Sequence, residues 1–240
     1  MIVASIGTIE PANVAGVGRD LQVIAEHRLR AVCAVASISA QDETGVRALF
    51  ALPDRMVAAQ LDALPQANAY RVGALGSAQN IDTVTRFLGR QPGAWIVVDP
   101  VMEATRGGSL YDGAAAAVIA LRELITGAPV IVTPNLQEAA SLTGMPVHDV
   151  TTMEAAGRDL VARGARAALV KGGHLEGEPI DVLIAGSGVH RFGAGRIAGE
   201  MRGRGCTLAA ALACELARGS DLQTAVARAR EYVRQQIAAS

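Results

Sequence analysis

The sequence is poor in aromatic residues, cysteine and net charge, and each shortage narrows the kind of protein that it encodes. Aromatic residues make up 3% of the 240 residues while 50% are apolar, so Ala, Val, Leu and Ile must fill the core. A formal net charge of −1 gives no electrostatic reason to expect a nucleic-acid partner. The three cysteines, Cys33, Cys206 and Cys214, are odd in number and unpaired in spacing, which predicts reduced thiols in the cytoplasm.

Long hydrophobic runs and common ligand motifs are also absent from the sequence. No run reaches the roughly 18 apolar residues of a membrane span, so no membrane partner is expected. Residues 1–5 lack the basic region of a signal peptide and are predicted to form a strand. GxxxxGK[ST], CxxC and HExxH patterns do not occur, which excludes a P-loop and these metal sites. Gly16 and Gly18 open a predicted helix, but Leu21 occupies the third glycine position of a dinucleotide fingerprint.

Short apolar runs alternate through most of the chain with segments whose apolar residues have helical spacing. The predicted strands are residues 2–6, 30–37, 70–75, 95–99, 130–133 and 167–171. The predicted helices are residues 16–26, 54–64, 80–88, 112–125, 136–142 and 152–163. Continuous apolar strands are typical of a parallel sheet covered on both faces. The sequence therefore predicts a three-layer α/β/α fold in a single domain over residues 1–240.

The last third of the chain departs from this alternation. Two strand-like runs, residues 181–185 and 189–192, flank a Gly-Ser-Gly turn and predict a β-hairpin. A glycine-rich loop at 193–205 leads into two predicted helices, residues 206–218 and 221–238, with Ser220 as the N-cap of the second. Further back in the chain, residues 39–52 are predicted to be a long functional loop.

The loop-to-helix junction at Gly203-Arg204-Gly205-Cys206-Thr207 is the first place that suggests chemistry. The first N–H groups of a helix lack internal partners, and together with the helix dipole they form a site suited to phosphate. Cys206 is placed where a thiol pKa falls, so its thiolate could take a proton from an alcohol. The alternative is an ordinary junction with a small buried cysteine. Arg202 and Arg204 flank the loop and either contact phosphate or are solvated.

Lys171 ends a predicted buried strand and is followed by Gly172, Gly173 and His174. Ligands of open α/β sheets bind at the carboxyl ends of strands, so Lys171 is placed to meet nucleotide phosphates. A strand-end lysine that simply reaches solvent is the alternative, and His174 is expected to be a loop residue rather than a catalyst.

Two further strand ends carry carboxylates. Asp99 closes one predicted strand, and Asn135 and Glu138 follow another on one face of the next helix. Asp99 and Glu138 could hold Mg²⁺, which binds few carboxylates and keeps several waters. For Asn135 and Glu138 the alternative is helix capping.

These pieces, in this order and from about Ile2 to the last helix, resemble the hydroxymethylpyrimidine and hydroxymethylpyrimidine-phosphate kinases. The matching segments are residues 40–46 with the family's AQNTxGV, 97–102 with VxDPVM, 133–139 with TPNxxEA, 171–175 with KGGHL, 205–208 with the end of HGTGCTL, and 15–21 with AGIQADL. The resemblance implies a ribokinase-like fold, usually dimeric, and ATP-dependent phosphorylation of the pyrimidine or its monophosphate in thiamine biosynthesis.

The resemblance also implies roles for residues on the substrate side. Gln41 would recognise the aminopyrimidine, since a primary amide offers a donor beside an acceptor. Asp20, Ala74 and Val101 would lie next to the substrate, and Cys206 would be the base near its hydroxyl.

On the phosphate side, the resemblance implies that the backbone N–H groups of Gly203 and Gly205 help to form an anion hole. Lys171, Asn135, Arg204 and Thr207 would contact ATP or its phosphates. Asp99 and Glu138 would support Mg²⁺.

The sequence departs from the family at several of these segments. Arg202 and Arg204 replace the His and Thr of HGTGC, and a lysine of the family's VAKSG loop becomes Thr105, with Arg106 adjacent. The family's methionine in GML becomes Ala74, which enlarges the expected pocket. These changes leave two other readings open: a kinase for another vitamin-like alcohol such as pyridoxal, or a pyrimidine-binding protein that has lost catalysis.

The first loop differs as well. Residues 7–16 replace the pattern G[ST]D[PS]SGGAG, with Glu10 in place of aspartate and Asn13-Val14 in place of a glycine pair. Glycines allow positive φ, which Asn tolerates and Val does not. The loop is therefore expected to follow a different path.

Overall fold

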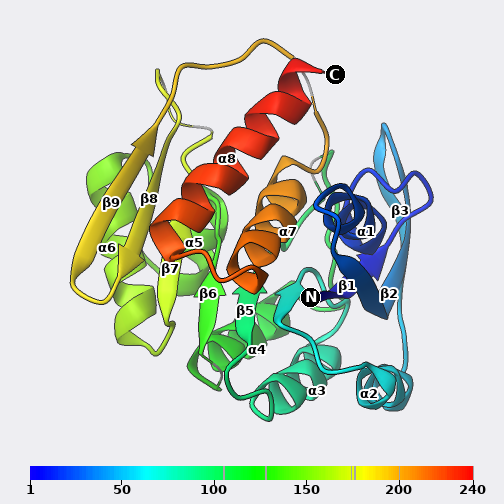
Figure 1. The fold of residues 1–240 in the computed structure, drawn as a ribbon. Helices are drawn as coiled ribbons and strands as arrows, with labels where there is room; N and C mark the ends of the chain where they lie inside the picture. Colours follow the sequence, from blue (N-terminus) through cyan, green and yellow to red (C-terminus); the bar gives the residue numbers. More distant parts are fainter. Residues whose placement is uncertain (105, 128, 174, 176, 200, 240) are drawn as a thin grey trace.

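A computed structural model describes residues 1–104, 106–127, 129–173, 175, 177–199 and 201–239. Its sheet has nine strands in the order β3-β2-β1-β4-β5-β6-β7-β8-β9 (Figure 1). The strands are β1 (Ile2–Ile9), β2 (Arg30–Asp42), β3 (Gly45–Ala51), β4 (Ala69–Val72), β5 (Trp95–Val98), β6 (Val130–Val132), β7 (Ala167–Val170), β8 (Ile180–Ala185) and β9 (Gly188–Gly193). Strands β2, β1, β4, β5, β6 and β7 run parallel, whereas β3, β8 and β9 pair antiparallel with their neighbours.

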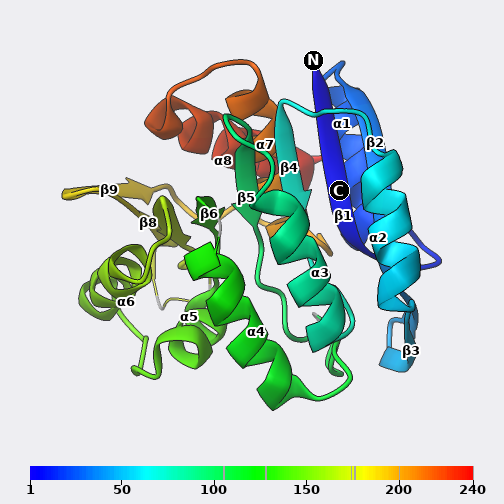
Figure 2. The same ribbon diagram turned by 90° about the horizontal axis from the view of Figure 1, so that it is seen from below.

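Helices cover both faces of this sheet and make three layers (Figure 2). One face carries α2 (Asp54–Ala63), α3 (Ala78–Leu88), α4 (Ala114–Gly127), α5 (Leu136–Thr143) and α6 (Val150–Ala162). The other face carries α1 (Gly16–Glu26), α7 (Arg204–Ala217) and α8 (Leu222–Ala238). The predicted three-layer, mostly parallel α/β/α fold with a C-terminal hairpin is confirmed.

The central strands are apolar on both sides because each side faces a layer of helices. In β5, Ile96 and Val98 pack into the cluster under α3 and α4, while Val97 between them packs into the cluster under α7. Alternate residues of a strand point to opposite faces, so a continuous apolar run is needed to bury both.

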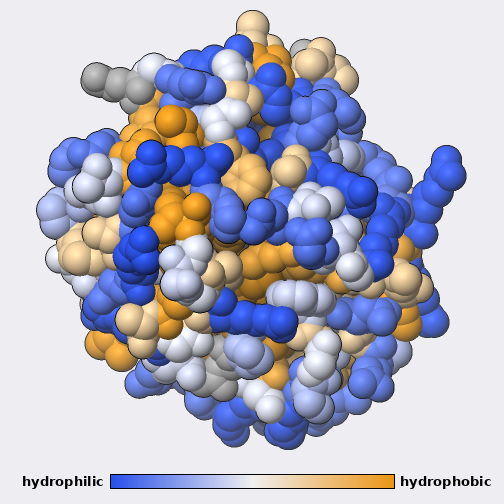
Figure 3. All heavy atoms as spheres, turned by 60° about the vertical axis from the view of Figure 1, so that its left-hand side comes forward, coloured by the Kyte–Doolittle hydropathy of each residue, from blue (hydrophilic) through white to orange (hydrophobic). Residues whose placement is uncertain are grey.

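The face formed by β8, β9 and α6 is seen in space-filling form in Figure 3, where polar side chains surround separate apolar patches. Apolar atoms make up much of any folded surface, so scattered patches of this kind need no special explanation. None of the helices in the described part of the chain combines the length and apolar character that a membrane span requires.

Two predictions about local structure are wrong. Residues 39–52 are not a loop, because β2 continues to Asp42 and pairs antiparallel with β3, with Ile38 opposite Phe50. The N-cap of α8 is Asp221, whose side chain accepts a hydrogen bond from the Thr224 N–H, and Ser220 instead donates to Glu215. The edge hairpin β2–β3 is exposed at many positions, so its sequence lacks the apolar pattern of the inner strands.

Candidate active site

The start of α7 lies at the carboxyl ends of the central strands. Gly203 precedes the helix with φ 71°, and a Cβ there would lie 2.1 Å from the Val14 carbonyl oxygen, so only glycine fits. The first turn holds Arg204, Gly205 and Cys206, two residues earlier than the predicted helix start. Its first backbone N–H groups lack partners within the helix, as every helix start does, and can donate to an anion.

Cys206 is partly exposed at this helix start. Burial raises the pKa of its thiol, Arg71 lowers it, and Asp99 and Asp20 raise it again, so that the pKa stands above its ordinary value. The predicted fall of the pKa at a helix start is therefore wrong. Desolvation outweighs the favourable field of the Arg71 guanidinium.

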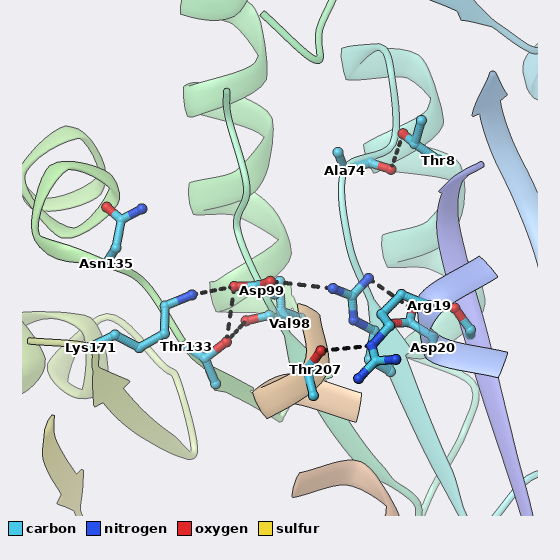
Figure 4. Close-up of polar contacts among 12 residues, drawn as sticks. Thr8, Arg19, Asp20, Ala74, Val98, Asp99, Thr133, Asn135, Lys171 and Thr207 are labelled. Atoms are coloured by element: carbon cyan, nitrogen blue, oxygen red, sulfur yellow. Dashed lines mark hydrogen bonds and ion pairs between the residues drawn. The ribbon is translucent and has the colours of Figure 1, made fainter. Parts of the chain in front are cut away.

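A row of alternating charges lies beside the start of α7 (Figure 4). Asp99 lies in its middle, at the end of β5, and is fully buried. Its Oδ1 accepts hydrogen bonds from Lys171 Nζ at 2.7 Å and from the Thr133 hydroxyl at 3.3 Å. Its Oδ2 accepts one from Arg71 Nη2 at 3.3 Å. On the far side Arg71 Nη1 pairs with Asp20 Oδ2 at 3.0 Å.

Lys171 joins this row to the first turn of α7. A Cβ on Gly205 would lie 3.1 Å from Lys171 Nζ and 3.6 Å from Asp99 Oδ2. The Lys171 side chain is 13% exposed, so the predicted alternative of a lysine reaching freely into solvent is wrong. Burial lowers the lysine pKa, but Asp99 and Glu138 raise it, and the net shift is upward. Lys171 therefore stays charged at the start of α7.

Asn135 and Glu138 form a reciprocal capping box at the start of α5. The Asn135 Oδ1 accepts from the Glu138 N–H at 2.9 Å, and Glu138 Oε2 accepts from the Asn135 N–H at 2.7 Å. The capping interpretation of this pair is confirmed. Glu138 Oε2 also lies 3.9 Å from Lys171 Nζ, and burial raises the Glu138 pKa to about 7.

The residues expected on the substrate side differ in how far they reach the surface. Gln41 is half-buried near the end of β2, next to a bulge, and Val101 is half-buried just beyond β5. Ala74 is 6% exposed, and its carbonyl accepts from the Thr8 hydroxyl. Asp20 is fully buried, where Ser5 donates to its Oδ2 at 2.6 Å. The structure thus places Asp20 behind the site surface rather than on it.

The first loop, residues 7–16, is held by one of its own carboxylates. Asn13 adopts φ 54°, and Val14 is not among the described residues with positive φ. Glu10 is 4% exposed, and its carboxylate accepts from the N–H groups of Ala12, Val14 and Ala15. The Glu10 carboxylate is therefore hydrogen-bonded inside this turn, in the segment where the family's pattern has glycines.

The arginines that replace family residues are engaged away from the first turn of α7. Arg202 Nη1 lies 2.9 Å from Glu43 Oε1 in the β2–β3 hairpin. The neighbouring Arg106 also approaches this carboxylate, with its Nη2 3.8 Å from Glu43 Oε2. The Arg204 guanidinium donates to the carbonyls of Met201 and Gly199. Glu43 thus links the loop before α7 to the hairpin that carries Gln41. Two other residues considered above, Thr105 and His174, lie outside the described residues.

Thr207 is buried and its hydroxyl accepts from Arg19 Nε at 3.0 Å (Figure 4). The same guanidinium donates from Nη2 to Gln236 in α8. Thr207 is therefore engaged with α1 rather than open to a ligand. Its predicted contact with phosphate stays a prediction.

Comparison with known proteins gives the same assignment as the sequence motifs. The model of the phosphomethylpyrimidine kinase family matches residues 10–240. A hydroxymethylpyrimidine/phosphomethylpyrimidine kinase from Streptomyces coelicolor is 35% identical over 236 residues, which cover 97% of this chain and 87% of the relative. The chain belongs to the phosphomethylpyrimidine kinase family.

Other members of this family differ in length. The thiamine biosynthesis bifunctional protein ThiED of Geobacter sulfurreducens is 37% identical over 224 residues, which span 91% of this chain and 45% of that protein. Among solved structures, a phosphomethylpyrimidine kinase from Clostridium difficile has a TM-score of 0.84 at 28% identity, with 99% of each chain covered. A pyridoxal kinase from Staphylococcus aureus in complex with AMP-PCP and pyridoxal has a TM-score of 0.88 at 26% identity, covering 99% of this chain and 87% of that one.

Membership in this kinase family raises the question of Mg²⁺, and the described side chains fit it poorly as a ready-made site. Asp99 Oδ1 already accepts from Lys171 and Thr133, and Oδ2 accepts from Arg71, so a metal would have to compete with these donors. Among the residues that the structure describes, no three His, Cys, Asp or Glu side chains gather as a metal site would need. The assignment of Asp99 and Glu138 to Mg²⁺ stays a prediction.

Sequence reasoning missed Arg71, which is the largest fully buried side chain of the structure. It lies in β4 between Tyr70 and Val72, inside the predicted strand 70–75, whose other residues are apolar. A charged residue inside an otherwise apolar central strand is itself a signal, because buried charges are rare unless they are paired.

Proposed function

We propose that this protein transfers the γ-phosphoryl group of ATP to 4-amino-5-hydroxymethyl-2-methylpyrimidine or to its monophosphate, in thiamine biosynthesis. The observation that carries this proposal is the first turn of α7, where Gly205, next to Cys206, lies beside the Lys171–Asp99 pair. The first backbone N–H groups of such a helix have no partner within the helix. An anion-binding helix start beside a buried cation suits a transferring phosphoryl group. The family and the printed names of its relatives support the pyrimidine as acceptor.

In the proposed reaction the pyrimidine hydroxyl oxygen attacks the γ-phosphorus, the bond to ADP breaks, and the hydroxyl proton passes to Cys206 Sγ. The backbone N–H groups of Gly205 and Cys206 would bind the developing charge on the phosphoryl oxygens. Lys171 would turn from Asp99 toward the phosphates, which are stronger acceptors because of their higher charge. Because the thiol pKa is raised, the thiolate needed as a base becomes more abundant in the alkaline range.

Mg²⁺ bound to the ATP phosphates would neutralise part of their charge, as it does in kinases generally. Asn135 is committed to capping α5, so its contribution to ATP binding would be to hold Glu138 in place. Arg204 would act through the loop carbonyls that it holds rather than by direct contact with phosphate.

Loss of catalysis is the weaker reading of the family departures. Arg202 and Arg204 are bonded to Glu43 and to loop carbonyls, so their guanidinium groups do not occupy the first turn of α7. This placement supports a working anion site rather than one filled by the protein's own cations.

A pyridoxal-like alcohol is the second candidate acceptor. Ala74 offers less side-chain volume than methionine would, and pyridoxal kinases are among the similar solved structures. A panel of hydroxymethylpyrimidine, its monophosphate and pyridoxal, assayed with the wild type and with Gln41→Ala, separates the two candidates. We expect Gln41→Ala to reduce kcat/KM for the pyrimidines most. Higher kcat/KM with pyridoxal in the wild type would reverse the assignment.

We further propose that the protein acts as a single-domain homodimer in the cytoplasm. Ile38, Phe50 and Met56 are 48, 62 and 53% exposed, and Ile38 pairs with Phe50 on the edge hairpin. Exposed apolar side chains on an edge strand favour contact with a second copy. The three free thiols and the proposed use of ATP support the cytoplasm as the compartment. Sedimentation of the wild type and of Phe50→Asp tests the dimer; an unchanged monomer in both would refute it.

A further inference from the structure

Arg71 is a buried cation that none of the proposed steps uses. Its side chain has no exposed surface, and it lies in β4, flanked in the sheet by β1 and β5. Space for its guanidinium depends on Gly73, since a Cβ there would lie 2.2 Å from Nη1. The strand is therefore built to hold an arginine at this position.

Stability alone does not account for such a residue. Buried ion pairs are often no more stabilising than apolar side chains of similar size. Arg71 also leaves Nε and Nη1 without a hydrogen bond among the described residues, although Nη1 pairs electrostatically with Asp20. Asp20 Oδ1 likewise lacks a hydrogen bond there. Unsatisfied buried donors carry a cost that a purely structural residue would not need to bear.

The position of Arg71 relative to α7 indicates which role offsets the free-energy cost of burying this side chain. Its Nη2 donates to Asp99 Oδ2, which is also the oxygen that a Cβ on Gly205 would approach to 3.6 Å. Its Nη1 faces Asp20 on α1, the helix whose first residue, Gly16, hydrogen-bonds Cys206 through the backbone. Arg71 thus connects Asp20 on α1 with Asp99 after β5, and its guanidinium lies close enough to the Cys206 thiol to interact with it.

We infer that Arg71 is a positioning residue for Cys206: it holds Asp20 and Asp99 on either side of the α7 start and keeps a fixed positive charge beside the thiol.

The charged groups that act on Cys206 come from several elements of the fold. Arg71 from β4 lowers the thiol pKa, and Asp99 from β5 and Asp20 from α1 raise it. Lys171, after β7, also interacts with the thiol, which raises the lysine pKa. Arg71 remains charged, because Asp20, Cys206 and Asp99 together raise its pKa despite burial. A guanidinium cannot lose its charge at any pH that the fold survives, so it provides a permanent field.

The test is the pH dependence of Cys206 alkylation by iodoacetamide in the protein without substrates, followed by mass spectrometry of the Cys206 peptide. Only the thiolate reacts, so the midpoint reports the thiol pKa. We expect Arg71→Met to move the midpoint upward and slow alkylation at pH 8 on the order of tenfold, the change that one pKa unit produces. Arg71→Lys should restore part of the rate. Arg86→Met, an exposed arginine of α3, is the matched control and should leave the midpoint unchanged.

Asp20→Asn supplies a change of opposite sign and does not depend on Arg71→Met being able to fold. Because Asp20 raises the thiol pKa, its neutral replacement should lower the midpoint. The inference would be overturned if Arg71→Met and Asp20→Asn both kept the wild-type alkylation midpoint, or if both shifted it in the same direction. In turnover assays Arg71→Met should lower kcat more than it changes the pyrimidine KM.

The use of this thiol in turnover rests on the proposed kinase function, but the alkylation experiment does not. A protein that phosphorylates neither pyrimidine would still show the predicted midpoint shifts. An active kinase with unshifted midpoints would refute the role of Arg71 alone.

Discussion

Neutralising Asp99 should destabilise the protein far more than neutralising an exposed aspartate. Asp99 is fully buried and is the common partner of Arg71 and Lys171, at 3.3 and 2.7 Å. In Asp99→Asn the amide nitrogen would face one of these donors. The other donor would keep a neutral amide oxygen, so the remaining carboxylate partners would be Glu138 at 3.9 Å for Lys171 and Asp20 for Arg71. Removing one partner of a buried ion pair costs about 3–5 kcal/mol.

For a chain of this size each kcal/mol lowers Tm by about 2–4 °C, so Asp99→Asn should lower it by roughly 6–20 °C. Asp82→Asn is the matched control, because Asp82 pairs with Arg86 at 3.0 Å but both side chains are about two-thirds exposed. An exposed pair contributes about 0–1 kcal/mol. Thermal unfolding followed by circular dichroism measures both. Equal Tm values for the two variants would refute the view that Asp99 anchors a buried ion network.

Three further predictions concern the residues around the proposed phosphoryl path. Cys206→Ala should reduce kcat on the order of 10²–10⁴-fold with a small change in pyrimidine KM, and an unchanged kcat would remove the thiol from the reaction. Lys171→Ala should raise the KM for ATP more than that for the pyrimidine, and equal increases would indicate a purely structural lysine. For Glu138, the folded-state pKa of about 7 lies above the ordinary 4.5, so the carboxyl's stabilising contribution is complete below about pH 4.5 and is lost as pH rises toward 7. The Tm of Glu138→Gln, which keeps the capping geometry, should therefore rise relative to wild type between pH 5 and 7.5, and a constant difference would contradict the raised pKa.

The sequence was sufficient for the parallel core of the fold because its strands are marked by composition. Residues such as Ile96, Val97 and Val98 must be apolar on both sides of the sheet, and that requirement leaves a continuous run. The β2–β3 hairpin was missed for the converse reason. Ile38 and Phe50 are exposed at an edge, and the turn between them is polar, so the segment has the composition of a loop.

The parts of the candidate site that lie at the end of a strand or the start of a helix could be predicted from the sequence. Asp99 and Lys171 each follow a buried strand, and Cys206 lies in the first turn of a helix, so their approach follows from the sheet topology. The pairing among side chains was not predictable in this way. Arg71 and Asp99 are 28 residues apart, and Lys171 and Asp99 are 72 apart, so no local pattern shows which carboxylate each cation meets.

The direction of the Cys206 pKa shift shows the same limit. A helix start lowers a thiol pKa wherever it occurs, and this effect can be read from the sequence. Burial raises the pKa, and the degree of burial depends on how α1, β4 and β5 pack around the thiol. The contribution of burial was available only from the three-dimensional structure.

Direct observation of phosphoryl transfer tests the central claim. Hydroxymethylpyrimidine and its monophosphate are each incubated with ATP, Mg²⁺ and the protein, and the products are followed by ³¹P nuclear magnetic resonance beside calorimetric binding of the same ligands. We predict ADP together with a phosphorylated pyrimidine, and loss of both products in Cys206→Ala. Tight pyrimidine binding without any phosphorylated product would contradict the account and indicate a binding protein built on the kinase fold.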